Sequence, residues 1–316
     1  MSSKSLLDPE LAPLLDAWPT VTLNAETLPA IRKSRAELAA SAGPLPDTVT
    51  LETRHVPGPC GAPDVAVRLI RPVNAARNAP AILHLHGGGY VLDSSDPTHA
   101  QSVAWATQFG ATVASVDYRL APETPAPGAV EDGYAALAWL HREAGTLQID
   151  TSRIAVAGES AGGGLAAALA LLVRDRAEFS FCHQQLIFPM LDDRTAVRTD
   201  LSTVYGEFIW TPASNHFGWS ALLGHAPGLD GVSPYAAPAR AEDLAGLPPA
   251  FLATGALDLF TEENLDYARR LMAAGVPTEL HVYPGAPHAF MAWGEAGVSR
   301  RYARDALSAM ARGLGV

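Results

Sequence analysis

The amino-acid sequence predicts an α/β fold in which a mainly parallel sheet is covered by helices on both faces. From about residue 48 to the end, short and almost continuously apolar segments alternate with longer amphipathic segments. Apolar strands of this kind are typical of parallel sheets, because both faces of such sheets are buried. In addition, the apolar run 154–157 breaks into Gly158-x-Ser160-x-Gly162 and continues as an Ala/Leu-rich helical pattern. That pattern indicates a sharp turn from a strand into a helix.

The expected sheet has eight strands. Thr48–Val56 and Val65–Arg71 come first, and the second of these alternates apolar and polar residues. The other six are short apolar runs: Ala81–Leu85, Thr112–Val116, Arg153–Ala157, Gln185–Phe188, Ala250–Thr254 and Glu279–Tyr283. Helical patterns lie between the strands, at about 98–109, 128–143, 161–176, 261–274 and 298–313.

Two stretches break this alternation. Residues 1–45 contain helical pieces without a strand pattern, and residues 190–245 pass through short helices and Pro/Gly-rich loops. A long excursion inside a compact α/β domain is typical of a lid or a binding element.

Composition limits the class of protein. The 316 residues are 48% hydrophobic and 17% charged, which is enough for a large core in one elaborated domain or two. A formal charge of −11 argues against nucleic acid or an anionic membrane as the main partner. Cys60 and Cys182 fit no metal or redox spacing and are expected to be reduced thiols. The N-terminus lacks a secretory apolar region, and no apolar run reaches the roughly eighteen residues of a membrane span, so we expect a soluble, cytoplasmic protein.

The glycine-flanked Ser160 is a candidate nucleophile, because a sharp turn would lift its hydroxyl clear of the sheet. Upstream, the sequence His86-Gly87-Gly88-Gly89 ends a predicted strand. Three glycines allow backbone N–H groups to turn toward a developing oxyanion. A flexible turn is the alternative. A phosphate-binding loop is disfavoured because no Lys-Ser/Thr follows the glycines.

His84 and His86 lie on the same side of the preceding strand and suggest a metal site. No third candidate ligand clusters nearby in the sequence, so we expect no metal ion.

Two further candidates follow predicted strands downstream. Asp258 comes after the strand at 250–254, and His288 lies in a Gly/Pro loop after the strand at 279–283. A serine hydroxyl is too weakly acidic to attack unaided, so His288 would accept its proton while Asp258 orients and stabilises the imidazole. For Asp258 the alternatives are a helix N-cap role, or Glu262 or Glu263 as the acid.

Together these motifs resemble the hormone-sensitive-lipase-like family of α/β-hydrolase carboxylesterases. The resemblance rests on His86-Gly-Gly-Gly89, Asp117-Tyr-Arg-Leu-Ala-Pro-Glu123, Gly158-Glu-Ser-Ala-Gly162, Asp258 and His288, and it extends over residues 45–316. It implies an α/β-hydrolase fold and an oxyanion hole built from the N–H groups of Gly88, Gly89 and Ala161. It also implies a catalytic core at 46–189 and 246–316, with 1–45 and 190–245 packed together as a helical cap.

Three residues depart from the family pattern, namely Glu159 before the serine, Leu259 after the acid and Ala289 after the histidine. None of them is a reacting group, so they bear on subfamily and substrate. We expect Asp117, Arg119 and Glu123 to form ion pairs that brace the glycine loop, and Asp192-Asp193-Arg194 to fix the cap junction.

Aromatic residues of the two irregular stretches, with the tyrosine after the glycines, are candidates for the wall of an apolar acyl or alcohol pocket: Trp18, Tyr90, Phe208, Trp210, Phe217 and Trp219. The alternative is that they pack the core of the cap itself.

The predicted function is cofactor-independent hydrolysis of small, uncharged and short-chain acyl esters through an acyl-enzyme. An amidase or peptidase on the same triad is the first alternative, and a non-catalytic small-molecule receptor on this fold is the second. An exposed edge strand at 279–283 would permit a homodimer.

Overall fold

The computed structural model describes residues 3–18, 20, 22–41, 43–59, 61–93 and 100–316. Within these ranges one sheet contains eight strands in the order β1-β2-β4-β3-β5-β6-β7-β8. The strands are β1 Val49–Val56, β2 Val65–Pro72, β3 Ala79–Leu85, β4 Thr112–Asp117, β5 Ile149–Glu159, β6 His183–Ile187, β7 Ala250–Gly255 and β8 Thr278–Tyr283. Every predicted strand is present. The largest difference is at β5, which begins at Ile149 rather than Arg153.

The sheet is mainly parallel, as predicted. From β4 through β3, β5, β6 and β7 to β8, each strand is parallel to its neighbour. Only β2 pairs in the antiparallel sense, with β1 on one side and β4 on the other. Because the carboxyl ends of the parallel strands share one edge, the loops after β3, β5, β7 and β8 meet there.

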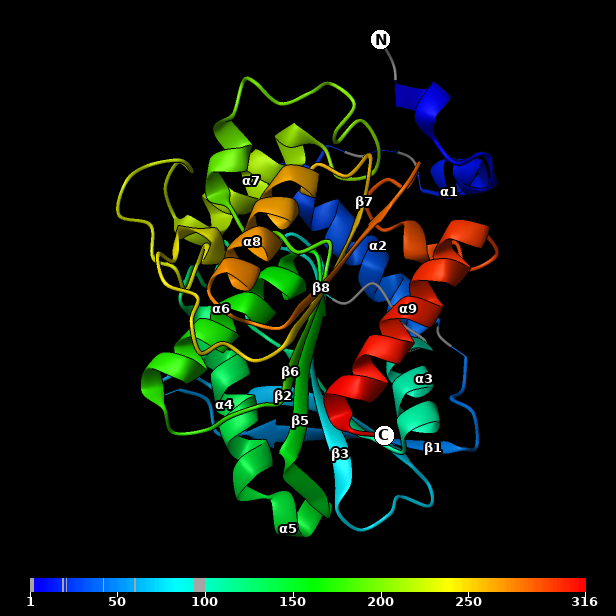
Figure 1. Ribbon diagram of the computed structural model, residues 1–316, viewed down its shortest axis with the longest axis vertical. Helices are drawn as coiled ribbons and strands as arrows, with labels where there is room; N and C mark the ends of the chain where they lie inside the picture. The colour runs from blue at the N-terminus through cyan, green and yellow to red at the C-terminus, as the bar shows by residue number, and fades with distance from the viewer. Residues whose placement is uncertain (1–2, 19, 21, 42, 60, 94–99) are drawn as a thin grey trace.

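The long helices cover both faces of the sheet (Figure 1). Helices α4 (Gly128–Arg142), α6 (Ala161–Arg176) and α8 (Thr261–Ala273) lie on one face, and α3 (Ala100–Phe109) and α9 (Gly297–Leu314) lie on the other. Successive side chains of a strand point to opposite faces. Ile82 therefore packs in the cluster that contains α3 and α9 residues, whereas Leu83 packs in the cluster of α4 and α6. The predicted helices are confirmed, although residues 98–99 lie outside the described ranges.

The two stretches without strands contact each other. Helices α1 (Ala12–Ala17) and α2 (Leu28–Ala40) come from the first, and α7 (Pro212–Leu223) comes from the second. The backbone N–H of Leu23 donates to Ser214 Oγ at 3.0 Å. Leu23 and Leu28 are buried in one cluster with Ala221 of α7 and with Val91, just after the glycine loop. Figure 1 shows α1 and α7 beyond the carboxyl edge of the parallel strands.

The remaining helices of the described ranges are short: η1 Ser3–Leu6, η2 Pro9–Leu11, α5 Ala144–Leu147, η3 Asp193–Val197, η4 Pro238–Arg240 and η5 Phe290–Ala292. No helix in the described part of the chain is long and apolar enough to cross a membrane. Cys182 is a half-buried free thiol, and Cys60 lies outside the described residues.

Candidate active site

Ser160 occupies the turn between β5 and α6, with φ 55° and ψ −122°. A non-glycine residue adopts such a conformation only where its surroundings impose it. Here the serine N–H donates to the carbonyl of Ile187 at 2.8 Å, which ties the turn to β6. The turn also needs glycine on both sides, because a Cβ on Gly158 would lie 2.2 Å from the Gly162 oxygen and a Cβ on Gly162 would lie 1.9 Å from the Leu85 oxygen.

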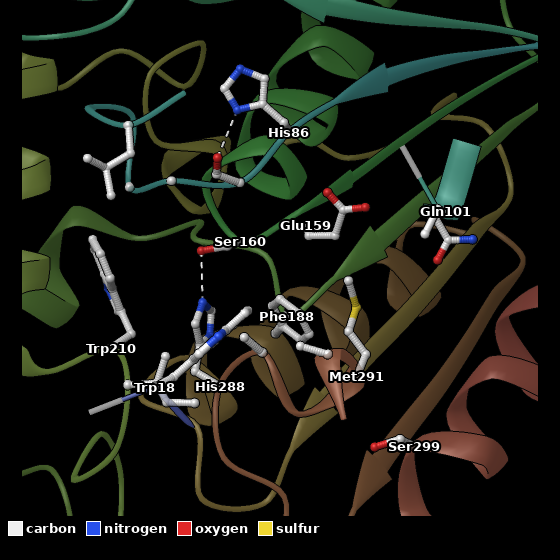
Figure 2. Close-up of a pocket in the computed structure, with 18 of the residues that line it drawn as sticks. Trp18, His86, Gln101, Glu159, Ser160, Phe188, Trp210, His288, Met291 and Ser299 are labelled. Atoms are coloured by element: carbon white, nitrogen blue, oxygen red, sulfur yellow. Dashed lines mark hydrogen bonds between the residues drawn. The ribbon is translucent and has the colours of Figure 1, made fainter. Parts of the chain in front are cut away.

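The serine hydroxyl meets an imidazole and a carboxylate at this turn (Figure 2). His288 Nε2 lies 2.9 Å from Ser160 Oγ, and His288 Nδ1 lies 2.7 Å from Asp258 Oδ2. Asp258 is fully buried, so its carboxylate favours the tautomer in which Nδ1–H donates to it. Nε2 then carries the lone pair that accepts the serine proton. The rings of Phe188 and Phe260 pack edge-on against the imidazole, at centroid distances of 4.7 and 5.3 Å.

Glu262 and Glu263, the alternative candidates for the catalytic acid, have other partners. Glu262 pairs with Arg198 at 2.6 Å on the surface. Glu263 is buried, and it accepts the Leu191 N–H at 2.7 Å and the Thr195 hydroxyl. Burial raises the pKa of Glu263 well above its ordinary value. Asp258 is not the N-cap of α8 (Thr261–Ala273), because that position is Phe260. Its second oxygen accepts the N–H of Phe260 at 3.0 Å, ahead of the helix.

The glycine loop after β3 faces the same space. Gly88 and Gly89 have φ of 134° and 60°, which suits glycine, and both line the cavity in front of Ser160. A Cβ on Gly88 would lie 2.4 Å from the Leu92 oxygen, and one on Gly89 would lie 2.2 Å from the Trp210 ring. Among the described residues, neither glycine N–H has a hydrogen-bond acceptor. Ala161 follows the serine as the first residue of α6. The arrangement can bind an oxyanion.

A cavity of about 740 Å³ opens in front of these groups. Of the six aromatic residues predicted for its wall, Trp18 and Trp210 line it. The other four pack elsewhere: Tyr90 donates its hydroxyl to the Met190 carbonyl at 2.8 Å, Trp219 packs against Tyr90, Phe208 joins a cluster with Leu7 and Leu11, and Phe217 joins the Leu23 cluster. Only Phe217 packs chiefly against α2 and α7, whereas Tyr90, Trp219 and Phe208 pack in clusters that include residues of the sheet.

This geometry agrees with the comparisons with known proteins. A family model described as the α/β-hydrolase fold matches residues 82–292, which is more than half of the chain. The chain belongs to the hormone-sensitive-lipase-like α/β-hydrolases. The predicted resemblance is therefore confirmed, and so is the fold class.

Relatives of this hydrolase match it over most of their length. Carboxylesterase NlhH of Mycobacterium tuberculosis is 36% identical, covering 90% of this chain and 89% of the relative. An ethyl acetate hydrolase of Pseudomonas putida is 33% identical, with 72% of each chain covered. Among solved structures, a bacterial heroin esterase superposes with a TM-score of 0.91 at 41% identity, with 98% of each chain covered.

The charged residues at the end of β4 and after it form the expected ion pairs. Asp117, Arg119 and Glu123 each form an ion pair, with Arg68, Asp132 and Arg32 respectively. Arg32, the partner of Glu123, also donates to the Val91 carbonyl at 2.8 Å, in the segment just after the glycine loop. At the cap junction, Asp193 is buried and pairs with Arg240, while Asp192 pairs with Arg194.

The two histidines of β3 and its end belong to separate networks. His86 is buried, stacks on Tyr118 and has its Nδ1 2.8 Å from the Gly87 oxygen. Desolvation lowers the pKa of His86 to about 4, so the ring is neutral at neutral pH. His84 instead contacts Ser115 and Glu159. No cluster of three or more metal-ligating side chains is found in the described part of the chain.

Sequence reasoning missed a polar section of the cavity wall. It contains Gln101 and Ser102 at the start of α3, Ser115 of β4 and Ser299 of α9, together with Glu159. Residues at the start of a helix, or alone in a strand, belong to no sequence motif that could have identified them. The departure of Glu159 from the family pattern was the one signal available in the sequence.

Proposed function

We propose that this α/β-hydrolase is a serine carboxylesterase in which Ser160, His288 and Asp258 are the catalytic residues. The observation that carries the proposal is the buried chain of hydrogen bonds from Asp258 through His288 to Ser160, at 2.7 and 2.9 Å. The ester-hydrolase class is supported by the relatives, which include a carboxylesterase and an ethyl acetate hydrolase.

The reaction follows from the positions of these groups. As Ser160 Oγ attacks the ester carbonyl, its proton passes to His288 Nε2, and Asp258 stabilises the imidazolium that forms. We assign the N–H groups of Gly88, Gly89 and Ala161 to the oxyanion. His288 then gives its proton to the departing alcohol, which leaves an acyl-enzyme. Water, activated by the same histidine, releases the acid and restores the serine.

The central test is Ser160→Ala. This variant should lose hydrolysis of p-nitrophenyl acetate by about 10³-fold or more, because removal of a triad member leaves only binding and the oxyanion hole. Unchanged hydrolysis in a folded Ser160→Ala protein would refute the assignment.

We propose that the preferred substrates are small, uncharged, short-chain acyl esters. Trp210 and Phe188 are buried side chains of the cavity wall, and together they limit the space beside Ser160. A series of p-nitrophenyl acetate, butyrate and decanoate tests this preference. Faster turnover of decanoate than of butyrate would contradict it.

The amidase or peptidase and the receptor gain no support from the relatives named above. Parallel assays with an acyl ester and the matching acyl anilide separate ester hydrolysis from amide hydrolysis. A receptor would bind such esters without turnover.

We further propose that residues 46–189 and 246–316 form the catalytic core, and that 1–45 and 190–245 form the cap. The contacts of Leu23 and Leu28 with the α7 region support this division.

A cytoplasmic location and a homodimer along the edge strand β8 stay predictions. Size-exclusion chromatography with light scattering tests the dimer.

A further inference from the structure

The cavity has two chemically different sides, separated by the Ser160–His288 pair (Figure 2). Trp18 and Trp210 lie on one side, whereas Glu159 and Gln101 lie on the other. Figure 2 also places the apolar Phe188 and Met291 near Glu159, so the second side combines apolar and polar groups. An ester that spans the serine therefore places its acyl and alcohol parts in different surroundings.

The Glu159 carboxylate is the most polar group of the second side. Glu159 is the last residue of β5 and precedes the serine, and its side chain is only 14% exposed. Both carboxylate oxygens lie 3.1 Å from one atom, His84 Nε2. With the proton on that nitrogen, His84 Nδ1 accepts the Ser115 hydroxyl at 2.9 Å, which satisfies the neutral ring.

Glu159 retains acceptor capacity toward the cavity. A carboxylate offers about four lone-pair sites, and His84 supplies one proton. A little-exposed carboxylate gains from further donors, because burial strengthens charge-assisted hydrogen bonds and penalises unmade ones. Gln101 and Ser299 lie on the same side as Glu159 in Figure 2, and they add neutral hydrogen-bonding groups to the cavity wall.

The ligand group that donates a hydrogen bond to Glu159 is expected to be neutral. Arg35 also lines the cavity, and its guanidinium is positively charged at neutral pH, so a second cation in this cavity would be repelled. A hydroxyl group donates one hydrogen bond and brings no charge.

We propose that Glu159 is a specificity-determining residue that accepts a hydrogen bond from a hydroxyl group on one arm of the ester. The natural substrates are then hydroxyl-bearing esters of small size. This inference rests on the proposed esterase function and deepens it.

Two isosteric substrate pairs test the inference, and each exchanges a hydroxyl for a methyl group. Methyl 3-hydroxybutanoate and methyl 3-methylbutanoate place the change on the acyl arm, while 2-hydroxyethyl acetate and propyl acetate place it on the alcohol arm. The measured quantity is kcat/KM for each member. The wild-type protein should favour the hydroxyl member of one pair, and that pair identifies the arm beside Glu159.

Glu159→Met removes the acceptor at nearly constant length and should lower that preference by about tenfold or more, while Glu159→Gln, which keeps a neutral acceptor, should lower it less. Glu262→Met is the matched control, because Glu262 lies outside the cavity wall and pairs with Arg198. It should leave the ratio unchanged. A residue that only braced His84 would change both members of a pair equally.

The inference is overturned if the wild-type protein favours the methyl member of both pairs, a result that needs no variant to fold. It is also overturned if Glu159→Met and Glu159→Gln leave the ratio of the favoured pair unchanged. Neither result touches the esterase assignment, which Ser160→Ala tests separately.

Discussion

The active site has a reacting side, formed by Ser160 and the glycine loop, and a pocket side, formed by the opposite wall of the cavity. The two are held in place in different ways. Around Ser160 and the glycine loop, backbone contacts set the geometry: a Cβ on Gly162 would lie 1.9 Å from the Leu85 oxygen, and one on Gly88 would lie 2.4 Å from the Leu92 oxygen. Across the cavity, the wall consists of side chains from irregular segments, such as Trp210 and the 43% exposed Trp18. The reacting groups therefore tolerate little change, whereas the pocket wall can vary while the chemistry persists.

The largest expected effect is on the reacting side. Asp258→Asn should reduce kcat for p-nitrophenyl acetate by about 10³- to 10⁴-fold, because an amide can donate to Nδ1 and stabilise the tautomer that cannot accept the serine proton. The fold should persist, since Asn retains the shape of Asp. Glu262→Gln, at the exposed rival acid, should change kcat less than about twofold. A loss of kcat below tenfold in Asp258→Asn would show that another group orients His288.

The next effect separates stability from substrate binding on the pocket side. Trp219 is fully buried and does not line the cavity, so Trp219→Ala should lower the free energy of unfolding by about 3–5 kcal/mol. Trp18 lines the cavity while largely exposed, so Trp18→Ala should cost less than about 1 kcal/mol but raise KM several-fold. Urea unfolding and steady-state kinetics measure both quantities. Equal KM changes in the two variants would remove the distinction.

Backbone crowding at the turn around Ser160 gives a slightly smaller effect on stability. Gly162→Ala places a methyl group against a backbone carbonyl that cannot move freely, and it should cost about 3 kcal/mol. A Cβ on Gly145 of α5 would have no other atom within 4 Å, so Gly145→Ala should be neutral or stabilising by up to about 1 kcal/mol. Similar costs for both changes, measured by urea unfolding, would argue against the crowding at the turn.

The smallest expected effect is a pH dependence at the cap junction. Burial holds the pKa of Glu263 well above the value of 4.5 expected in the unfolded chain, so the native state binds more protons than the unfolded state between the two pKa values. Stability from this group is complete below pH 4.5 and declines as pH rises toward the native pKa. Glu263→Gln keeps an acceptor for the Leu191 N–H but replaces the acceptor of the Thr195 hydroxyl with an amide N–H group. Because the amide does not ionise, this variant should flatten the decline. Unfolding free energies at pH 5 and pH 8 test it, and an unchanged slope would contradict the assignment.

The reacting side was largely predictable from the sequence. Gly87, Gly88, Gly158 and Gly162 mark places where one backbone passes close to another, and Gly89 lies against the Trp210 ring. Such places allow few other residues. Asp258 and His288 follow apolar strands whose carboxyl ends share one edge of the sheet. Local patterns thus indicated which side chains would meet.

The pocket side was not predictable in the same way. Trp210 and Trp219 lie in one short segment, yet one lines the cavity and the other is buried against Tyr90. Which of them faces substrate depends on how α7 packs, and composition carries no such information. Gln101 and Ser299 reach the cavity only because α3 and α9 begin at its rim. Likewise, Arg32 supports the segment after the glycine loop through a contact 59 residues away in sequence.

Covalent labelling of the serine tests the central claim most directly. After reaction with a fluorophosphonate, mass spectrometry should find one adduct, on the peptide that contains Ser160, in step with the loss of ester hydrolysis. His288→Ala should label far more slowly, because the hydroxyl then lacks its base. Complete inactivation with the adduct on another residue, or full hydrolysis by protein labelled at Ser160, would contradict the account.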